Sequence, residues 1–270
     1  MKKKLILWMV WFTCCTAAVT GSMVDPIQLG DLLYREDDGN ITITDFTGSG
    51  IAAIIPAKID GKPVTDIQAF HFIGFHGLAA PCWGLKTIQV DPDNTHFSSL
   101  DGVLFNKDQS TLIRYPMGKQ GTYTIPAGVT NLDYSAFVGC VGLTSVMISS
   151  DLSGIHGGPF PMCSSLESIE ADVNNAHYSS LDGVLFDKNQ STLIQYPTGK
   201  KGGYRIPSTV THIGEGSFAS CRKLSSVDIP PGVTIIESGA FAGCLGLTDI
   251  VIPSTVKRIE SDAFAGCSAL

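Results

Sequence analysis

The sequence predicts a β-rich solenoid built from short strands and tight turns, with two small β-meanders inserted between its coils. Three observations predict it. Cysteines recur at one fixed interval, apolar residues recur at fixed offsets around them, and residues 96–116 return almost unchanged as residues 177–197. A fixed period between about 20 and 50 residues is typical of solenoids, whose coils bury an apolar face only by stacking on their neighbours.

Residues 1–22 have the three-part layout of a secretory signal peptide. Lysines occupy positions 2–4, an apolar run covers residues 5–19, and small residues follow. The alternative is a membrane anchor, which needs about 20 apolar residues, but Thr13 and Thr16 interrupt a run that is already shorter. We therefore predict export with cleavage, giving a secreted or cell-surface protein without a membrane span after cleavage. A lipoprotein signal stays an alternative.

Residues 23–54 are predicted to form an N-terminal β-hairpin cap. Two strand-like segments, residues 32–34 and 41–44, flank the turn sequence Asp-Asp-Gly-Asn at 37–40. Aspartate followed by glycine between apolar segments is a strong signal for a hairpin turn. We expect this hairpin to cover the open end of the solenoid core.

The six cysteines after residue 22 mark the coils of the solenoid, which we predict to span residues 55–270. The interval from Cys221 to Cys244 is the same as that from Cys244 to Cys267, and it separates Cys140 from Cys163 as well. The two longer intervals, from Cys82 to Cys140 and from Cys163 to Cys221, are equal to each other. Two coils therefore carry inserts of one size.

Each coil repeats one apolar frame, although the first copy is irregular around Cys82. The coil before Ile252-Pro253 shows the frame most clearly: Ile229-Pro230, Val233, Ile236, Ala240-Phe241, Cys244, Leu247 and Ile250. The β-branched alternation near its end is typical of a short strand, which proline then stops. The segment from alanine to cysteine is too short for a helix, so we expect one helical or 3₁₀ turn. Glycine before several cysteines, at Gly139, Gly243 and Gly266, lets the chain turn there.

The two inserts, near residues 91–124 and 172–205, are copies of each other. Each contains the segment Ser-Ser-Leu-Asp-Gly-Val-Leu-Phe, with hairpin-turn dipeptides at Asp101-Gly102 and Asp182-Gly183. A polar turn and a further strand-like run follow. Each insert is therefore predicted to be a small β-meander between coils.

The repeated pattern resembles the BspA-like leucine-rich repeat family. The frame Ile-Pro-x-x-Val-x-x-Ile-x-x-x-Ala-Phe-x-x-Cys-x-x-Leu-x-x-Val-x-Ile-Pro carries the resemblance over roughly residues 33–270, and the insert motif is also similar. It implies a curved, right-handed leucine-rich-repeat solenoid that is exported or on the cell surface, often bacterial, and used for adhesion or protein recognition. It implies no catalytic motif. Pro159, in place of alanine before Phe160, is a minor departure from the pattern.

Amino-acid composition argues against two further classes of protein. The chain is 44% hydrophobic and 16% charged, with a net charge of −7. These values argue against a disordered chain. The absence of a basic stripe argues against nucleic-acid binding through phosphate contacts.

The sequence contains no convincing site for chemistry. The cysteines lack the CxxC spacing of zinc sites, and we favour a ladder of buried free thiols over disulfides between coils, because inward side chains in register are spaced too widely. The segment at 214–219 matches G-x-G-x-x-A outside any βαβ unit, and no nucleophile elbow accompanies the histidines. We therefore predict a protein that is not an enzyme and has no cofactor or metal.

A binding surface is predicted on the outward face of the strands. Outward positions lie between the inward apolar residues of each strand, and repeat proteins commonly bind through such faces. The candidates are Thr87, Gln89, Ser145, Met147, Ser168, Glu170, Ser226, Asp228, Asp249 and Val251.

Two functional hypotheses follow. The first is an exported or surface protein that binds a protein or glycan without catalysis. The second is a structural spacer or a fragment of a larger surface protein, because the sequence stops at Leu270, partway through a coil.

Overall fold

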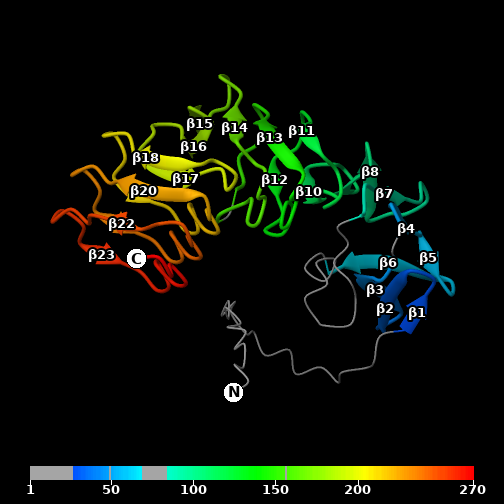
Figure 1. The fold of residues 1–270 in the computed structure, drawn as a ribbon. Coiled ribbons are helices and arrows are strands. Elements are labelled where there is room, and N and C mark those ends of the chain that lie inside the picture. Colours follow the sequence, from blue (N-terminus) through cyan, green and yellow to red (C-terminus); the bar gives the residue numbers. More distant parts are fainter. Residues whose placement is uncertain (1–26, 49, 69–83, 156) are drawn as a thin grey trace, which may run out of the picture.

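The computed structural model describes residues 27–48, 50–68, 84–155 and 157–270, and within these ranges it contains strands and turns but no helix. Figure 1 shows the strands stacked along an arc, from the N-terminal sheet to the last coil. The predicted β-solenoid is confirmed. The signal peptide predicted for residues 1–22 lies outside the described residues, as do Ala69, Phe70 and Cys82 of the irregular first coil.

The N-terminal sheet contains the expected hairpin. Its order is β1-β2-β3-β6-β5, with bounds Ile27–Leu29, Leu32–Asp37, Asn40–Phe46, Lys62–Ile67 and Lys58–Ile59. The hairpin β2–β3 turns at Asp38 and Gly39, which both have positive φ. Strand β3 pairs in parallel with β6, so the hairpin joins the first coil through backbone hydrogen bonds. The boundary predicted at residue 54 stays a prediction.

One parallel ladder follows the strand-like part of the repeat. It consists of three short sheets: β4–β7, β11–β13–β14 and β18–β20–β22. In the second and third sheets, partners in neighbouring coils are separated by one cysteine interval, as in Ser145 with Ser168 and Ser226 with Asp249. The bounds are Ala52–Ile55, Thr87–Val90, Gly121–Thr124, Leu143–Ile148, Ser168–Ala171, Gly202–Arg205, Leu224–Asp228 and Asp249–Ile250.

A second parallel ladder continues out of each insert. The inserts are antiparallel meanders, β8–β9–β10 and β15–β16–β17, as predicted. Strand β10 pairs in parallel with β12, and β17 pairs in parallel with β19. The ladder then continues from β19 to β21 and from β21 to β23. The bounds are Phe97–Leu100, Val103–Asn106, Thr111–Arg114, Asn131–Leu132, Tyr178–Leu181, Val184–Asp187, Thr192–Gln195, His212–Ile213, Ile235–Ile236 and Arg258–Ile259.

The segments from alanine to cysteine are successive turns, and the helical detail of the prediction is not seen. In one coil the amides of Ala136, Val138 and Cys140 each bond the carbonyl three residues earlier. Alternate amides instead reach the next coil, as when Gly139 donates to the Pro161 carbonyl. Bonding between coils therefore replaces the continuous local bonding that a 3₁₀ helix needs.

The predicted apolar frame forms the core. Most of its positions are buried, whereas Ile155 and Ile250 are partly buried. Aromatic rings stack between coils, with centroids 5.1, 4.7 and 5.2 Å apart along Tyr196, Phe218, Phe241 and Phe264. Ile259 is an exception and is exposed, because its strand β23 is the outermost of its sheet. Stacking thus buries apolar side chains that a single coil would leave exposed to solvent.

Candidate functional site

The predicted binding residues lie in the first ladder, on three separate sheets. Thr87 and Gln89 belong to β7, four residues to β13 and β14, and Ser226, Asp228 and Asp249 to β20 and β22. Val251 lies just past the end of β22. Alternation along each strand explains the placement, since Val146, Ile169 and Val227 between them point into the core and are buried.

Each of these sheets also has a strand that the sequence-based prediction did not include. Strands β4, β11 and β18 add their own outward residues in register: Ala52 and Ile54, Thr122 and Thr124, and Gly203 and Arg205. The signal was present, because Ile55-Pro56, Ile125-Pro126 and Ile206-Pro207 repeat the strand-ending pair of the other coils. We call the outward residues of these three sheets, taken in chain order, the first, middle and third patch. Together they form the strand face.

The two insert hairpins interrupt the strand face. The tip of each insert hairpin lies against the strand before it: the amides of Ile88 and Ile169 donate to the carbonyls of Gly102 and Gly183 at 2.8 and 2.9 Å. A side chain at Gly102 would overlap Thr87, and one at Gly183 would press on Ser168. Both tip glycines also have φ of +75°.

Four of the predicted contact residues are half-buried, among them Ser145 and Glu170 of the middle patch. Thr87 and Ser168 are half-buried beneath the hairpin tips rather than fully outward. The tips are held from their other side, where the ammonium groups of Lys119 and Lys200 donate to the carbonyls of Asp101 and Asp182. The strand face is thus divided into patches by two fixed hairpins.

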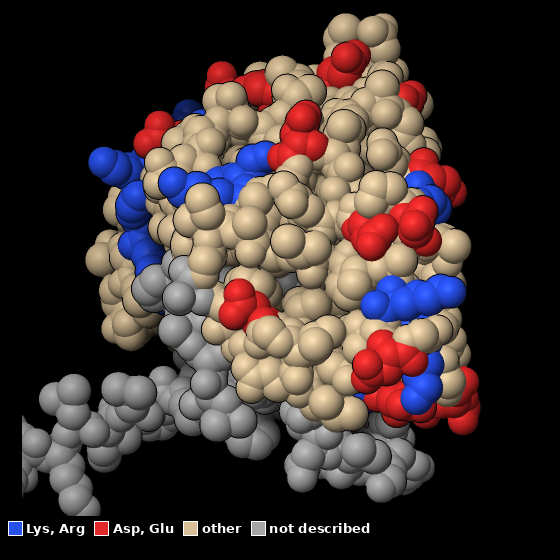
Figure 2. Space-filling model, turned by 90° about the vertical axis from the view of Figure 1, so that its right-hand side faces the viewer, with Lys and Arg blue, Asp and Glu red and all other residues tan. Residues whose placement is uncertain are grey.

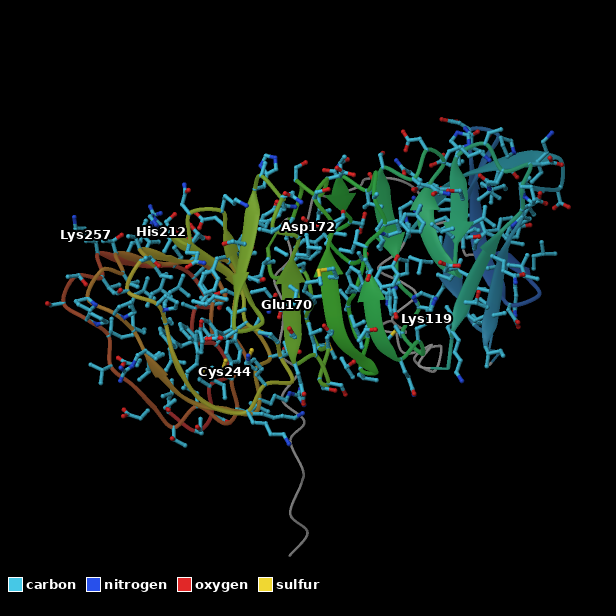
Figure 3. The ribbon with its side chains drawn as sticks, turned by 90° about the horizontal axis from the view of Figure 1, so that it is seen from above. Lys119, Glu170, Asp172, His212, Cys244 and Lys257 are labelled. Atoms are coloured by element: carbon cyan, nitrogen blue, oxygen red, sulfur yellow. The ribbon has the colours of Figure 1, made fainter. Side chains whose placement is uncertain are left out.

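The middle patch contains Thr122, Thr124, Ser145, Met147, Ser168 and Glu170. Met147 pairs in register with Glu170 and is 41% exposed. Ser168 Oγ donates to Glu170 Oε1 at 2.5 Å, and Ser180 Oγ of the neighbouring hairpin donates to Oε2 at 2.9 Å. Figure 3 labels Glu170 on its strand and Asp172 farther along the same segment. The patch therefore combines hydroxyls, one exposed thioether and one oriented carboxylate.

The third patch has a different character because its charges are partly paired. Arg205 Nε lies 3.0 Å from Asp228 Oδ2 across β18 and β20, and both side chains are well exposed. An exposed pair of this kind contributes little stability, about 0–1 kcal/mol. Asp249 and Val251 are exposed beside it. The patch presents mixed charge to solvent.

A shallow hollow of about 400 Å³ lies at the start of the middle strands. It is lined by Met117, Gly118, Gln120, Val141, Gly142 and Ser165. It is open to solvent and has one hydroxyl and one amide among apolar and glycine residues. These features suit contact with a partner surface better than enclosure of a small ligand.

The five cysteines among the described residues form the expected ladder of free thiols. Cys140, Cys163, Cys221 and Cys244 are buried and Cys267 is partly buried. Each thiol donates to a backbone carbonyl in the preceding coil, as from Cys163 to Phe137 and Cys244 to Phe218, both at 3.1 Å. Burial raises the pKa of the Cys244 thiol to about 12, which favours the protonated form of this thiol at neutral pH.

No group of three or more metal-binding side chains occurs in the described part of the chain. Within those same residues no helix is long and apolar enough to cross a membrane. Figure 2, which looks at the N-terminal end of the arc, shows acidic and basic side chains interspersed rather than a field of one sign.

A family model decides the classification. Residues 119–201 and 202–270 match the BspA type leucine-rich repeat region, in six copies. The chain belongs to this family. The match covers the middle and third patches, so the strands of this leucine-rich repeat protein that carry them are family repeats.

Solved structures include similar leucine-rich repeat proteins. A leucine-rich cell surface protein from Faecalibacterium prausnitzii is 21% identical, over 92% of this chain and 87% of that one, with a TM-score of 0.44. The pneumococcal vaccine antigen PcpA is 18% identical, over 91% and 80%, with a TM-score of 0.48. A leucine-rich repeat protein from Eubacterium ventriosum is 17% identical, over 89% and 94%, with a TM-score of 0.43. No curated protein matches this chain.

Proposed function

We propose that this leucine-rich repeat protein is exported, stays secreted or at the cell surface, and binds a protein or glycan through its strand face without catalysis. Export is supported by the signal-like residues 1–22 and is consistent with the family. The observation that carries the binding proposal is the strand face itself. Its outward side chains are held in register by parallel pairing, on a rigid stack of buried coils.

The side chains of this face favour recognition over chemistry. The middle patch offers hydroxyls, a thioether and a carboxylate, with no base and nucleophile pair among its residues. Rigid strands lower the entropy lost when a surface is contacted, because the side chains are already positioned. Surfaces of this kind are how solenoid proteins usually bind partners.

The test compares two substitutions of equally exposed apolar residues. Met147→Arg places a bulky charge in the middle patch, whereas Leu245→Arg does so at a turn in the C-terminal half; the two residues are 41% and 43% exposed. Purified wild type and both variants are screened against a panel of cell-surface and matrix proteins and a glycan array. We expect at least one ligand, lost in Met147→Arg and kept in Leu245→Arg. No ligand for the wild type, or equal binding by both variants, would contradict the proposal and favour a structural spacer.

A further inference from the structure

We propose that the middle patch receives a lysine or arginine side chain of a protein ligand, with the Glu170 carboxylate as its anchor. This inference rests on the proposed function, because it names the partner chemistry of the same strand face. Four features of the described residues carry it: the orientation of the carboxylate, its lack of a counter-ion, the exposed thioether beside it, and the duplicated frame that tolerates a neutral residue there.

The carboxylate of Glu170 is held by two hydroxyl groups. Ser168 donates to one oxygen at 2.5 Å and Ser180 to the other at 2.9 Å. Ser180 Oγ is itself fixed, because it accepts a hydrogen bond from the Ala171 amide at 3.0 Å. An ionised carboxylate has about four acceptor positions, so two remain for an incoming donor. The geometry is set before any ligand arrives, which reduces the entropy lost on binding.

Glu170 has no cation of its own among the residues that the structure describes. The ion pairs there join Lys62 to Glu36, Arg205 to Asp228 and Arg258 to Glu260. The third patch thus pairs its Asp228 internally, whereas the middle patch leaves its carboxylate available. Hydrogen bonds from a cationic donor to a carboxylate are among the strongest side-chain contacts at an interface.

The surroundings favour a long basic side chain over a small cation or a sugar. Met147 lies next to Glu170 in register and exposes 41% of its surface. Lysine and arginine carry an apolar stem that packs on such a surface while the charged head reaches a carboxylate. The outward residues of the patch include no aromatic ring on which a sugar could stack. The net charge of −7 also favours a basic partner.

The first insert provides a natural comparison within the same chain. In this earlier copy, Gln89 occupies the position of Glu170, and Ser99 occupies the position of Ser180. The frame is retained, because Ser99 Oγ accepts from the Val90 amide at 3.0 Å, as Ser180 does from Ala171. A neutral glutamine is therefore compatible with this local structure. We therefore expect Glu170→Gln to fold.

The experiment uses the full protein and a random-peptide display library as the probe. Enriched peptides are synthesised, and their affinities are measured for the wild type, Glu170→Gln, Met147→Arg and Asp228→Asn. We expect enrichment of lysine or arginine flanked by apolar residues, and about tenfold weaker binding to Glu170→Gln. Binding also weakens at high salt, because screening shortens the reach of charges from about 10 Å at 0.1 M to about 3 Å at 1 M. Asp228→Asn changes affinity less than twofold.

The outcomes separate this inference from the proposed function. Ligands that Met147→Arg abolishes but Glu170→Gln leaves unchanged, including glycans, would keep the strand face as a binding surface and overturn the basic anchor. Peptides without basic residues, or no enrichment at all, would likewise overturn it. Binding that neither variant affects would contradict the proposed function as well. Because Gln89 shows that glutamine fits this frame, a loss in Glu170→Gln is not a folding defect, and circular dichroism of the variant checks this directly.

Discussion

The residue before each of the five repeat cysteines that the structure describes has a left-handed backbone. Gly139, Gly243 and Gly266 have φ of +73°, +71° and +73°, as the glycine pattern predicted, but Met162 and Ser220 have +61° and +62° at the same position. A side chain in this region costs roughly 1–2 kcal/mol. The coil therefore imposes this conformation, and glycine lowers its free-energy cost.

Substitutions at this position should change stability in opposite directions. We expect Met162→Gly and Ser220→Gly to raise the free energy of unfolding by about 0.5–1 kcal/mol, since glycine removes the strain. Gly243→Ala should lower it by about 1 kcal/mol through φ alone, because an added Cβ would meet neighbours only at 3.8 Å. Urea unfolding measures the free energy of unfolding of each variant. A destabilised Met162→Gly together with an unchanged Gly243→Ala would contradict the strain argument.

The thiol ladder makes stability depend on alkaline pH. Burial, then the neighbouring Cys267, raises the pKa of Cys244 from 9.0 to about 12, and burial raises that of Cys221 well above its usual value. The folded state therefore holds protons that the unfolded chain releases. Stability is fully present below about pH 9 and is lost as pH rises from there toward the folded pKa.

We expect the free energy of unfolding to fall between about pH 9 and about pH 10.5, approaching about 1.4 kcal/mol per pH unit for each fully titrating thiol. Cys244→Ala should be less stable at pH 8, because it leaves a cavity, but should show a shallower decline. Urea unfolding across this pH range gives the slopes. Equal slopes for wild type and variant would show that the thiol at 244 does not contribute.

At the scale of elements, a buried asparagine side chain attaches each insert to the preceding coil. These two residues, Asn94 and Asn175, are called asparagine clips here, and the sequence-based prediction missed them. The buried Asn175 side chain donates to the carbonyls of Ser149 and Leu152 at 2.7 and 2.9 Å, and accepts from the amides of His177 and Tyr178 at 2.8 Å. Asn94 does the same in the first insert, bonding Pro56, His96 and Phe97. The signal was an asparagine two residues before the histidine in both copies.

Removing a clip should loosen its insert. Asn175→Ala leaves two buried carbonyls and two amides without these partners, at a cost of about 2–4 kcal/mol. Asn174→Ala, next to it and exposed, should change stability by less than about 0.5 kcal/mol. Chemical denaturation provides the values, and hydrogen exchange localises the loss to β15 and β16. Similar stabilities for the two variants would show that the clip is dispensable.

The sequence predicted the strands and meanders better than it predicted the contacts between them. Alternating apolar residues indicated β13, β14 and β20, and Asp-Gly indicated both hairpin turns, because these signals are local. Strands β11 and β18 were missed because they lie within the predicted inserts, near residues 91–124 and 172–205, and lack the apolar alternation of β13 and β20. The contact of Gly102 with Thr87 joins segments distant along the chain, so no local pattern reports it.

At the scale of the whole molecule, stacking explains the unusual composition. Coils that bury their apolar frame on both sides leave few positions for charge, which accounts for 16% charged and 44% hydrophobic residues. Buried cysteines and glycine turns belong to this same frame. The surface that remains in register within each sheet is the strand face, and we propose its middle patch as the binding surface.

The central claim, that the middle patch contacts the ligand, is tested most directly by oxidative footprinting of two methionines. Met147 lies in the patch and Met162 on a turn, and both are 41% exposed, so each serves as the other's control. Oxidation of both is followed by mass spectrometry with and without a peptide enriched on the protein. Binding should slow oxidation of Met147 several-fold and leave Met162 unchanged. Protection of Met162 alone, or of neither methionine by a bound peptide, would contradict the account.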